Sequence, residues 1–109
     1  MAFDKGLAQR ISEELSERTD VVEKKMFGGL CFMVSGHMCC GIVGDRLMAR
    51  VKKENYDKYL SETFASEMDF TGKSLKGMIY VSAEGLESDN ELRKWVQRSL
   101  EMVRSLPPR

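Results

Sequence analysis

The chain of 109 residues carries 17 Lys or Arg and 17 Asp or Glu, so its formal net charge is zero. This length predicts a single domain, residues 1–109, that buries a core without disulfide or metal staples. Balanced charge gives no sign of an overall basic surface for non-specific nucleic-acid binding, and leaves a local basic patch open. The longest apolar run is far shorter than the roughly 20 residues that span a bilayer, and the first residues contain no apolar signal segment. Three cysteines, an odd number, suit reduced thiols. We therefore expect a cytoplasmic protein that does not associate with membranes.

The first predicted element is an amphipathic helix over about residues 4–18. Leu7, Ile11 and Leu15 recur at helical spacing with polar residues between them. Asp4 precedes them as a candidate N-cap. The apolar stripe needs a partner, so we expect this helix to lie on a sheet.

The segment that follows predicts a β-meander holding all three cysteines and the only histidine. Residues 21–27 and 30–34 are extended in pattern, with Gly28-Gly29 between them. These two glycines fit either a tight hairpin turn or a bend or bulge inside one long strand, and the residues leave both open. Ser35-Gly36 and Gly44-Asp45 suit two-residue hairpin turns.

These two turns predict cross-strand registers. The first pairs Val34 with His37, Met33 with Met38, Phe32 with Cys39, and Cys31 with Cys40. The second pairs Val43 with Arg46, Ile42 with Leu47, Cys40 with Ala49, and Cys39 with Arg50. Because side chains alternate across a sheet, each register also assigns faces.

One predicted face carries no charge and is expected under the helices. It collects Cys31, Met33, Met38, Cys40, Ile42, Leu47, Ala49 and Val51. The opposite face is mixed but rich in apolar groups, a composition that often marks association surfaces. It collects Leu30, Phe32, Val34, His37, Cys39, Gly41, Val43, Arg46, Met48 and Arg50.

The C-terminal half predicts a short helix over residues 52–60, then strands over 67–70 and 77–82 joined through Thr71-Gly72-Lys73 into a second hairpin. Ser88-Asp89-Asn90-Glu91 is a capping box that opens the longest helix, which Pro107-Pro108 stops. The expected buried stripe of this helix is Leu92, Trp95, Val96, Ser99, Leu100 and Val103. Helices and strands in separate blocks predict an α+β fold of two layers with an antiparallel sheet.

The cysteine hairpin is the candidate for chemistry. Cys31, His37, Cys39 and Cys40 carry soft-metal ligands, but the predicted register places Cys39 and Cys40 on opposite faces. A Cys31–Cys40 disulfide fits an opposed pair but not a reducing cytosol. Cys39 could act as a nucleophile with His37 as its base, but the sequence shows no third, orienting carboxylate for such a site. Buried, reduced core thiols are the commoner explanation, so we predict no catalytic, cofactor-binding or metal-binding residues.

Several motifs resemble the TfoX/Sxy N-terminal domain family. They are Lys25-Met26-Phe27-Gly28-Gly29, the Gly36-His37-Met38 turn, Met68-Asp69-Phe70-Thr71-Gly72 with Lys76-Gly77, and Leu106-Pro107-Pro108. The resemblance covers nearly the whole chain. It implies a two-layer α-β(3)-α-β(2)-α fold, similar to secretion-chaperone-like domains, in which residues 24–34 form one long strand bent at Gly28-Gly29.

The resemblance also implies a functional class. Named members of that family are regulators of natural competence in bacteria, which act with a cyclic-AMP-responsive transcription activator and carry a second, C-terminal domain. We expect this chain to consist of the first domain alone, and the family supplies no catalytic residues to carry over. It implies a stand-alone regulatory domain.

Together, these features lead us to expect a non-enzymatic regulatory or protein-interaction domain that works through its outer sheet face. The candidate partner-binding residues are Phe32, Val34, Met48, Arg46 and Arg50. A homodimer through this face is expected, with a covered monomer as the alternative. We expect an unidentified protein partner, no cofactor, and no specific nucleic-acid binding by this chain alone. The alternatives are a small-molecule or metal-binding domain that uses the cysteine hairpin, and a minor enzyme that uses Cys39 and His37.

Overall fold

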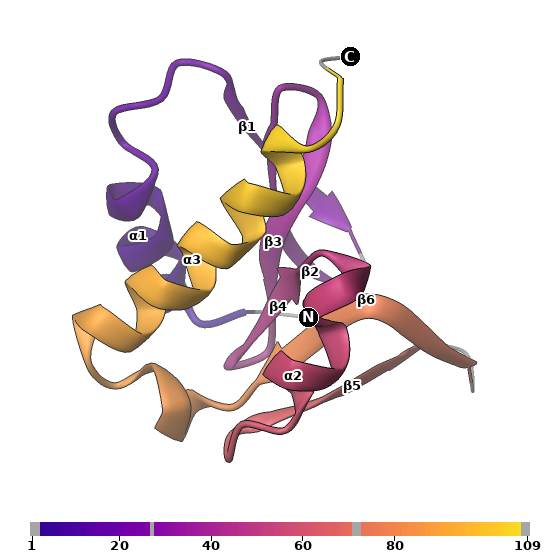
Figure 1. The fold of residues 1–109 in the computed structure, drawn as a ribbon. Helices are drawn as coiled ribbons and strands as arrows, with labels where there is room; N and C mark the ends of the chain where they lie inside the picture. Colours follow the sequence, from indigo (N-terminus) through magenta and orange to yellow (C-terminus); the bar gives the residue numbers. More distant parts are fainter. Residues whose placement is uncertain (1–2, 27, 71–72, 108–109) are drawn as a thin grey trace.

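Three helices cover one face of a six-stranded antiparallel sheet in the computed structural model, which describes residues 3–26, 28–70 and 73–107 (Figure 1). The strand order is β1-β2-β3-β4-β6-β5. The strands are β1 Val21–Met26, β2 Gly29–Val34, β3 His37–Val43, β4 Arg46–Arg50, β5 Ala65–Phe70 and β6 Lys73–Val81. The helices are α1 Lys5–Glu14, α2 Tyr56–Leu60 and α3 Asp89–Arg104, with short 3-10 segments η1 Lys53–Asn55 and η2 Ala83–Leu86. The predicted α+β class with two layers is confirmed.

The first helix forms as its sequence predicts but ends earlier. The Asp4 carboxylate caps it by accepting a hydrogen bond from the Leu7 amide at 3.1 Å. Leu7, Ile11 and Leu15 are all buried in the core. The helix proper stops at Glu14, where the predicted segment ran on to residue 18. The Asp4 amide also donates to the Gly44 carbonyl at 2.8 Å, which ties the start of α1 to the β3–β4 turn.

The last helix, α3, runs diagonally across the sheet and packs on β3 and β4 (Figure 1). The Ser88 hydroxyl accepts from the Glu91 amide at 3.1 Å, so the predicted N-cap is confirmed. The Glu91 carboxylate bonds Lys94 at 2.8 Å. Every residue of the predicted stripe is buried: Leu92, Trp95, Val96, Ser99, Leu100 and Val103.

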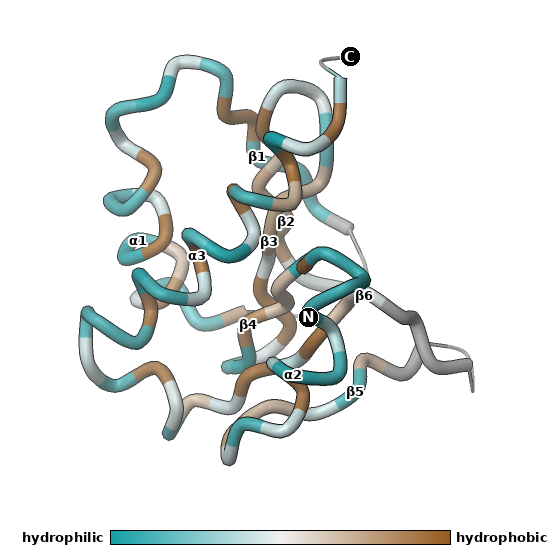
Figure 2. Tube along the Cα trace, in the orientation of Figure 1, coloured by the Kyte–Doolittle hydropathy of each residue, from teal (hydrophilic) through white to brown (hydrophobic). Residues whose placement is uncertain are grey.

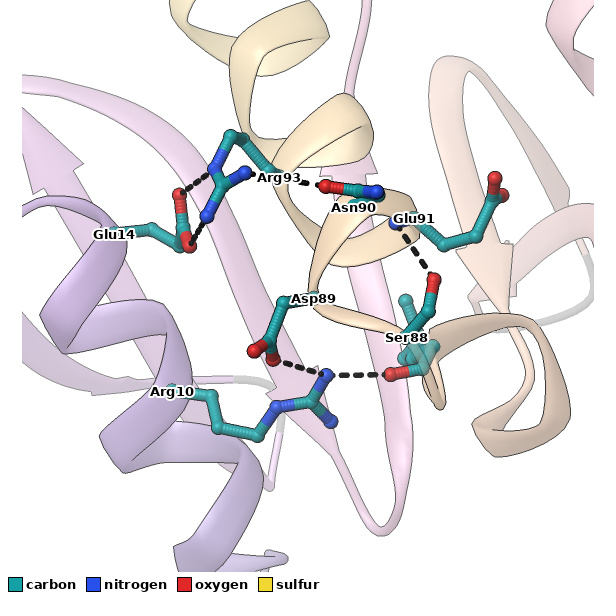
Figure 3. A network of polar contacts seen from close by, with 8 residues as sticks. Arg10, Glu14, Ser88, Asp89, Asn90, Glu91 and Arg93 are labelled. Carbon is teal, nitrogen blue, oxygen red and sulfur yellow. Dashed lines mark hydrogen bonds and ion pairs between the residues drawn. The ribbon is translucent and has the colours of Figure 1, made fainter.

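Polar contacts join α1 to the start of α3 (Figure 3). Arg10 donates to the Leu86 carbonyl at 2.7 Å and lies 3.3 Å from the Asp89 carboxylate. One turn further along both helices, Arg93 binds both carboxylate oxygens of Glu14. Ion pairs of this kind near the surface contribute little stability each. They add to the apolar contacts through which α1 and α3 share the main core.

The two glycines at positions 28 and 29 form a hairpin, and the bent single strand implied by the family resemblance is wrong. β1 and β2 pair antiparallel, with Met26 opposite Gly29. Gly28 has a φ of +75°, which favours glycine in a tight turn. Gly29 lies so close to the Ile42 carbonyl oxygen that a β-carbon would overlap it. Four strands therefore precede α2, and the order is α-β(4)-α-β(2)-α. Phe27 lies outside the described residues.

The Ser35-Gly36 and Gly44 turns form as predicted, with φ values of +53° at Ser35, +81° at Gly36 and +62° at Gly44. The pairs next to the first turn are confirmed, Val34 with His37 and Met33 with Met38. A bulge between Phe32 and Met33 then shifts the register. Phe32 therefore pairs with Cys40 and Cys31 with Gly41, so the predicted Phe32–Cys39 and Cys31–Cys40 pairs are wrong.

The β3–β4 ladder confirms three of its four predicted pairs: Val43 with Arg46, Ile42 with Leu47, and Cys40 with Ala49. It ends at the Cys40–Ala49 pair, so Cys39 and Arg50 do not pair. The second predicted hairpin is also confirmed, because β5 and β6 pair antiparallel, although both strands are longer than predicted. Its connecting residues 71–72 lie outside the described residues. Among the helices described, none is long and apolar enough to cross a membrane.

Candidate interaction surface

The two faces of the sheet carry two separate apolar clusters. The main core contains residues from all three helices, including Ile11, Tyr56 and Leu100. A second, smaller group, the outer cluster, contains strand residues alone. Its buried members are Cys31, Met48, Met68 and Tyr80, and its partly buried members are Met38, Val43 and Met78. Hydrophobic residues follow the central strands, and hydrophilic residues recur along the helices (Figure 2). The outer cluster is therefore the candidate surface.

Two of the five predicted partner-binding residues lie elsewhere. Phe32 and Val34 are buried in the main core under the helices, with exposed fractions of 1% and 0%. The bulge is the physical reason, because an extra residue in β3 changes which β2 side chains share a face with Ile42. Leu30 is in the main core for the same reason, while Cys31 belongs to the outer cluster.

The other three predicted residues do share the outer face. Met48 is in the outer cluster, and alternation along β4 places Arg46 and Arg50 on the same side. The Arg46 guanidinium carbon lies 3.9 Å from the centre of the Tyr80 ring, a cation–π contact. Arg50 donates to the Met38 carbonyl at 3.2 Å. The side chain of Arg46 is exposed and that of Arg50 half-buried.

The first strand extends this surface to the edge of the sheet. Val22 pairs with Met33, and Lys24 pairs with Cys31, so both point to the outer side. Val22 is 55% exposed, and Lys24 is also exposed. The outer face thus combines partly exposed apolar side chains with cationic ones.

The three cysteines of the hairpin are buried and divided between the two faces of the sheet. Cys31, Cys39 and Cys40 are free thiols with no exposed surface. Cys31 lies in the outer cluster and Cys40 in the main core. A hydrogen bond with Cys39, together with burial, raises the pKa of the Cys40 thiol, and burial raises that of Cys31. A raised pKa disfavours the thiolate, which is the nucleophilic form, at Cys31 and Cys40. No group of three or more potential metal ligands comes together within the described residues.

The only histidine has a structural contact. His37 is largely buried, and its Nε2 lies 2.6 Å from the Pro107 carbonyl oxygen. This contact fastens the segment after α3 to the β2–β3 hairpin. Because a carbonyl oxygen can only accept a hydrogen bond, Nε2 carries the proton in this contact and does not itself serve Cys39 as a base.

The helical side holds one cluster that sequence reasoning missed. The Arg98 guanidinium stacks over the Tyr59 ring at 3.8 Å and the Trp95 ring at 4.6 Å. It also bonds the Glu62 carboxylate at 2.8 Å. A hollow of about 340 Å³ lies beside this cluster, lined in part by Glu62 and Trp95. Burial acts to raise the pKa of Glu62, but hydrogen bonds from Arg98 and Lys94 outweigh it and lower the pKa. Because α2 and α3 meet only in the folded chain, sequence spacing gives no signal for this cluster.

The TfoX N-terminal domain family matches residues 13–103, which is most of the chain. The chain therefore belongs to the TfoX N-terminal domain family, as its motifs predicted. Comparisons with curated proteins and with solved structures found no match.

Proposed function

We propose that this chain is a non-enzymatic regulatory domain that binds a protein partner through the outer face of its sheet. One observation carries the proposal: all three helices pack on one face, while the other bears an apolar cluster made of strand residues alone. The partly exposed members of this cluster, Met38, Val43 and Met78, leave some apolar surface in contact with water, and such surface often marks a contact site. Membership of the TfoX N-terminal domain family supports the regulatory class.

The state of the thiols supports a role without catalysis. Cys39, the candidate nucleophile, is fully buried in the main core. A nucleophile needs access to its substrate and an activating base. Binding through the sheet requires neither, and flexible methionine side chains suit adaptable contact surfaces.

The proposal is tested by capture from a cytosolic extract on the immobilised chain. Met38→Asp with Val43→Asp places two carboxylates at partly exposed positions of the outer cluster. Ser12→Asp, at an exposed position of α1, is the matched control. We expect proteins retained by the wild type to be lost with the outer-face variant and kept with Ser12→Asp, while circular dichroism shows all three chains folded. A retained set that is the same for all three would overturn the proposal.

A further inference from the structure

We propose that the partner of the outer face is an acidic protein segment that also carries apolar side chains. This inference rests on the proposed function and adds the chemistry of the partner. It follows from three features of the described residues: the sign of the charges on this face, the lack of carboxylates that pair with them, and the small aromatic surface.

Among the side chains that the structure describes, the charged ones that the register directs outward all have the same sign. Lys24 is opposite Cys31, Arg46 is opposite Val43, and Arg50 is opposite Met78. Since the whole chain is neutral, this excess of positive charge is a property of the face. A partner with the opposite charge would be attracted to it and oriented by it.

These cations also differ from those on the helical side in their partners. Arg10, Arg93, Lys94 and Arg98 each form an ion pair with a carboxylate of the chain. Lys24, Arg46 and Arg50 form no ion pair with a described residue. Carboxylates of a partner can therefore reach them without displacing a carboxylate of the described residues.

The apolar part of the face has a limited accessible area. Cys31, Met48 and Met68 are fully covered, and the partly exposed side chains are those around them, Met38, Val43 and Met78. Met38 and Val43 of β3 lie between Lys24 at the β1 edge and the two arginines of β4, and Met78 of β6 lies on the other side of those arginines. A fitting segment therefore alternates apolar and acidic residues across the face.

The same features disfavour a second copy of the chain. Two identical outer faces meeting about a two-fold axis would bring six cations into one interface. Like charges brought together lower affinity. Five residues of the predicted outer face would drive self-association: Leu30, Phe32, Val34, Val43 and Met48. The first three are already buried in the main core, and only Val43 and Met48 lie on the outer face.

Single-stranded nucleic acid is also a weaker fit. Sheet surfaces that bind it use exposed aromatic rings on which bases stack. Among the residues of the outer cluster that the structure describes, the one aromatic residue is Tyr80. Its exposed fraction is 8%, and Arg46 already covers its ring. The apolar contacts of methionine and valine favour a protein.

The experiment selects binders from a random peptide display library on the full-length chain, then measures the affinity of the selected peptides as synthetic compounds. One variant reverses charge on the face, Lys24→Glu with Arg46→Glu. Its control makes the same change in net charge on the helical side, Lys5→Glu with Lys58→Glu. The apolar variant is Met38→Asp with Val43→Asp. Sedimentation and binding of an oligo-dT strand are measured on the wild type alongside.

We expect the selected peptides to combine acidic and apolar residues. Their affinity should fall about tenfold or more with the charge-reversed face, fall also with the apolar variant, and stay unchanged with the helical-side control. High salt should weaken binding. Peptides that lose affinity only with the apolar variant would overturn the acidic partner and leave the proposed function standing. Peptides unaffected by either variant would overturn both.

Two further outcomes would also overturn the acidic partner. One is a dimer at micromolar concentration that the apolar variant dissociates, since the occupant would then be a second copy. The other is an oligo-dT affinity that exceeds that of every selected peptide and is lost with the charge-reversed face, since the ligand would then be a nucleic acid.

Discussion

Met48 lies across Gly41, its cross-strand partner in the β3–β4 ladder. A β-carbon on Gly41 would stand 2.7 Å from the terminal methyl carbon of Met48 and 2.6 Å from the Leu30 carbonyl oxygen. The missing side chain at position 41 therefore leaves the space in which the methionine lies. This contact helps explain how Met48 is fully buried on a face that no helix residue joins.

Gly41→Ala should destabilise the chain. The added methyl group must push against a backbone carbonyl as well as a flexible side chain, and overpacking of this kind costs about 1–3 kcal/mol in unfolding free energy. Urea unfolding measures the loss. Gly6→Ala is the control, because a β-carbon there meets only the exposed Asp4 side chain at 3.3 Å, and it should stay within about 0.5 kcal/mol. Equal values for the two variants would contradict the close contact at Gly41.

The adjacent glycines of the β1–β2 hairpin should respond differently to alanine. In Gly28→Ala the added β-carbon meets open space, so the only cost is backbone strain at a φ of +75°. This strain should lower the unfolding free energy by about 1–2 kcal/mol. Gly29→Ala must separate β2 from the Ile42 carbonyl, so we expect a loss of about 3 kcal/mol or more. Thermal and urea unfolding compare them. A Gly29→Ala chain no less stable than Gly28→Ala would contradict the observed strand pairing.

Leu100→Ala tests the main core beneath α3. Leu100 is 4% exposed and belongs to the same cluster as Ile11 and Trp95. Removing its isobutyl carbons leaves a cavity, and core truncations of this kind cost about 2–5 kcal/mol. Gln97→Ala, at an exposed position of the same helix, should stay within about 0.5 kcal/mol. If Leu100→Ala, like Gln97→Ala, changes the unfolding free energy by no more than about 0.5 kcal/mol, the assignment of Leu100 to the core is wrong.

Protonation of the Asp20 carboxylate should lower the stability of the folded chain in acid. Hydrogen bonds from Arg18 and Ser35 lower the pKa of its carboxyl from 3.8 to about 2. Because the folded pKa is below the unfolded one, the stabilisation is complete above pH 3.8 and is lost as the pH falls toward 2. Asp20→Asn should be less stable than the wild type at neutral pH, and that gap should narrow over this range.

The hydroxyl of Ser35 gives a graded test of the same link, since it donates to Asp20 at 2.5 Å. Ser35→Ala should keep part of the acid dependence, through Arg18, and lose the rest. Thr19→Ala, at the exposed neighbouring position, should leave it unchanged. Unfolding midpoints are recorded between pH 5 and 2. If Asp20→Asn and the wild type have the same midpoints over this range, Asp20 does not contribute to the loss of stability in acid.

The amino-acid sequence alone determined the helices, the Ser35-Gly36 and Gly44 turns, and the family. Ser88 and the apolar stripe of α3 predict their helix because capping and 3.6-residue periodicity are local properties. Ser35-Gly36 predicts its turn because few residues accept positive φ. The pairs nearest that turn, Val34–His37 and Met33–Met38, follow directly from it.

Only the tertiary structure decided the faces of the sheet and therefore the composition of the candidate surface. A single extra residue in β3, at Cys39, moves Phe32 and Val34 from the predicted outer face into the core. Such a bulge is set by how a strand fits both of its neighbours, and no local signal in the sequence marks it. The same holds for Gly28-Gly29, where turn and bend differ only in whether β1 finds β2 as its partner. Contacts between residues distant in sequence, such as Gly29 with Ile42 and Glu62 with Arg98, exist only once the layers have packed.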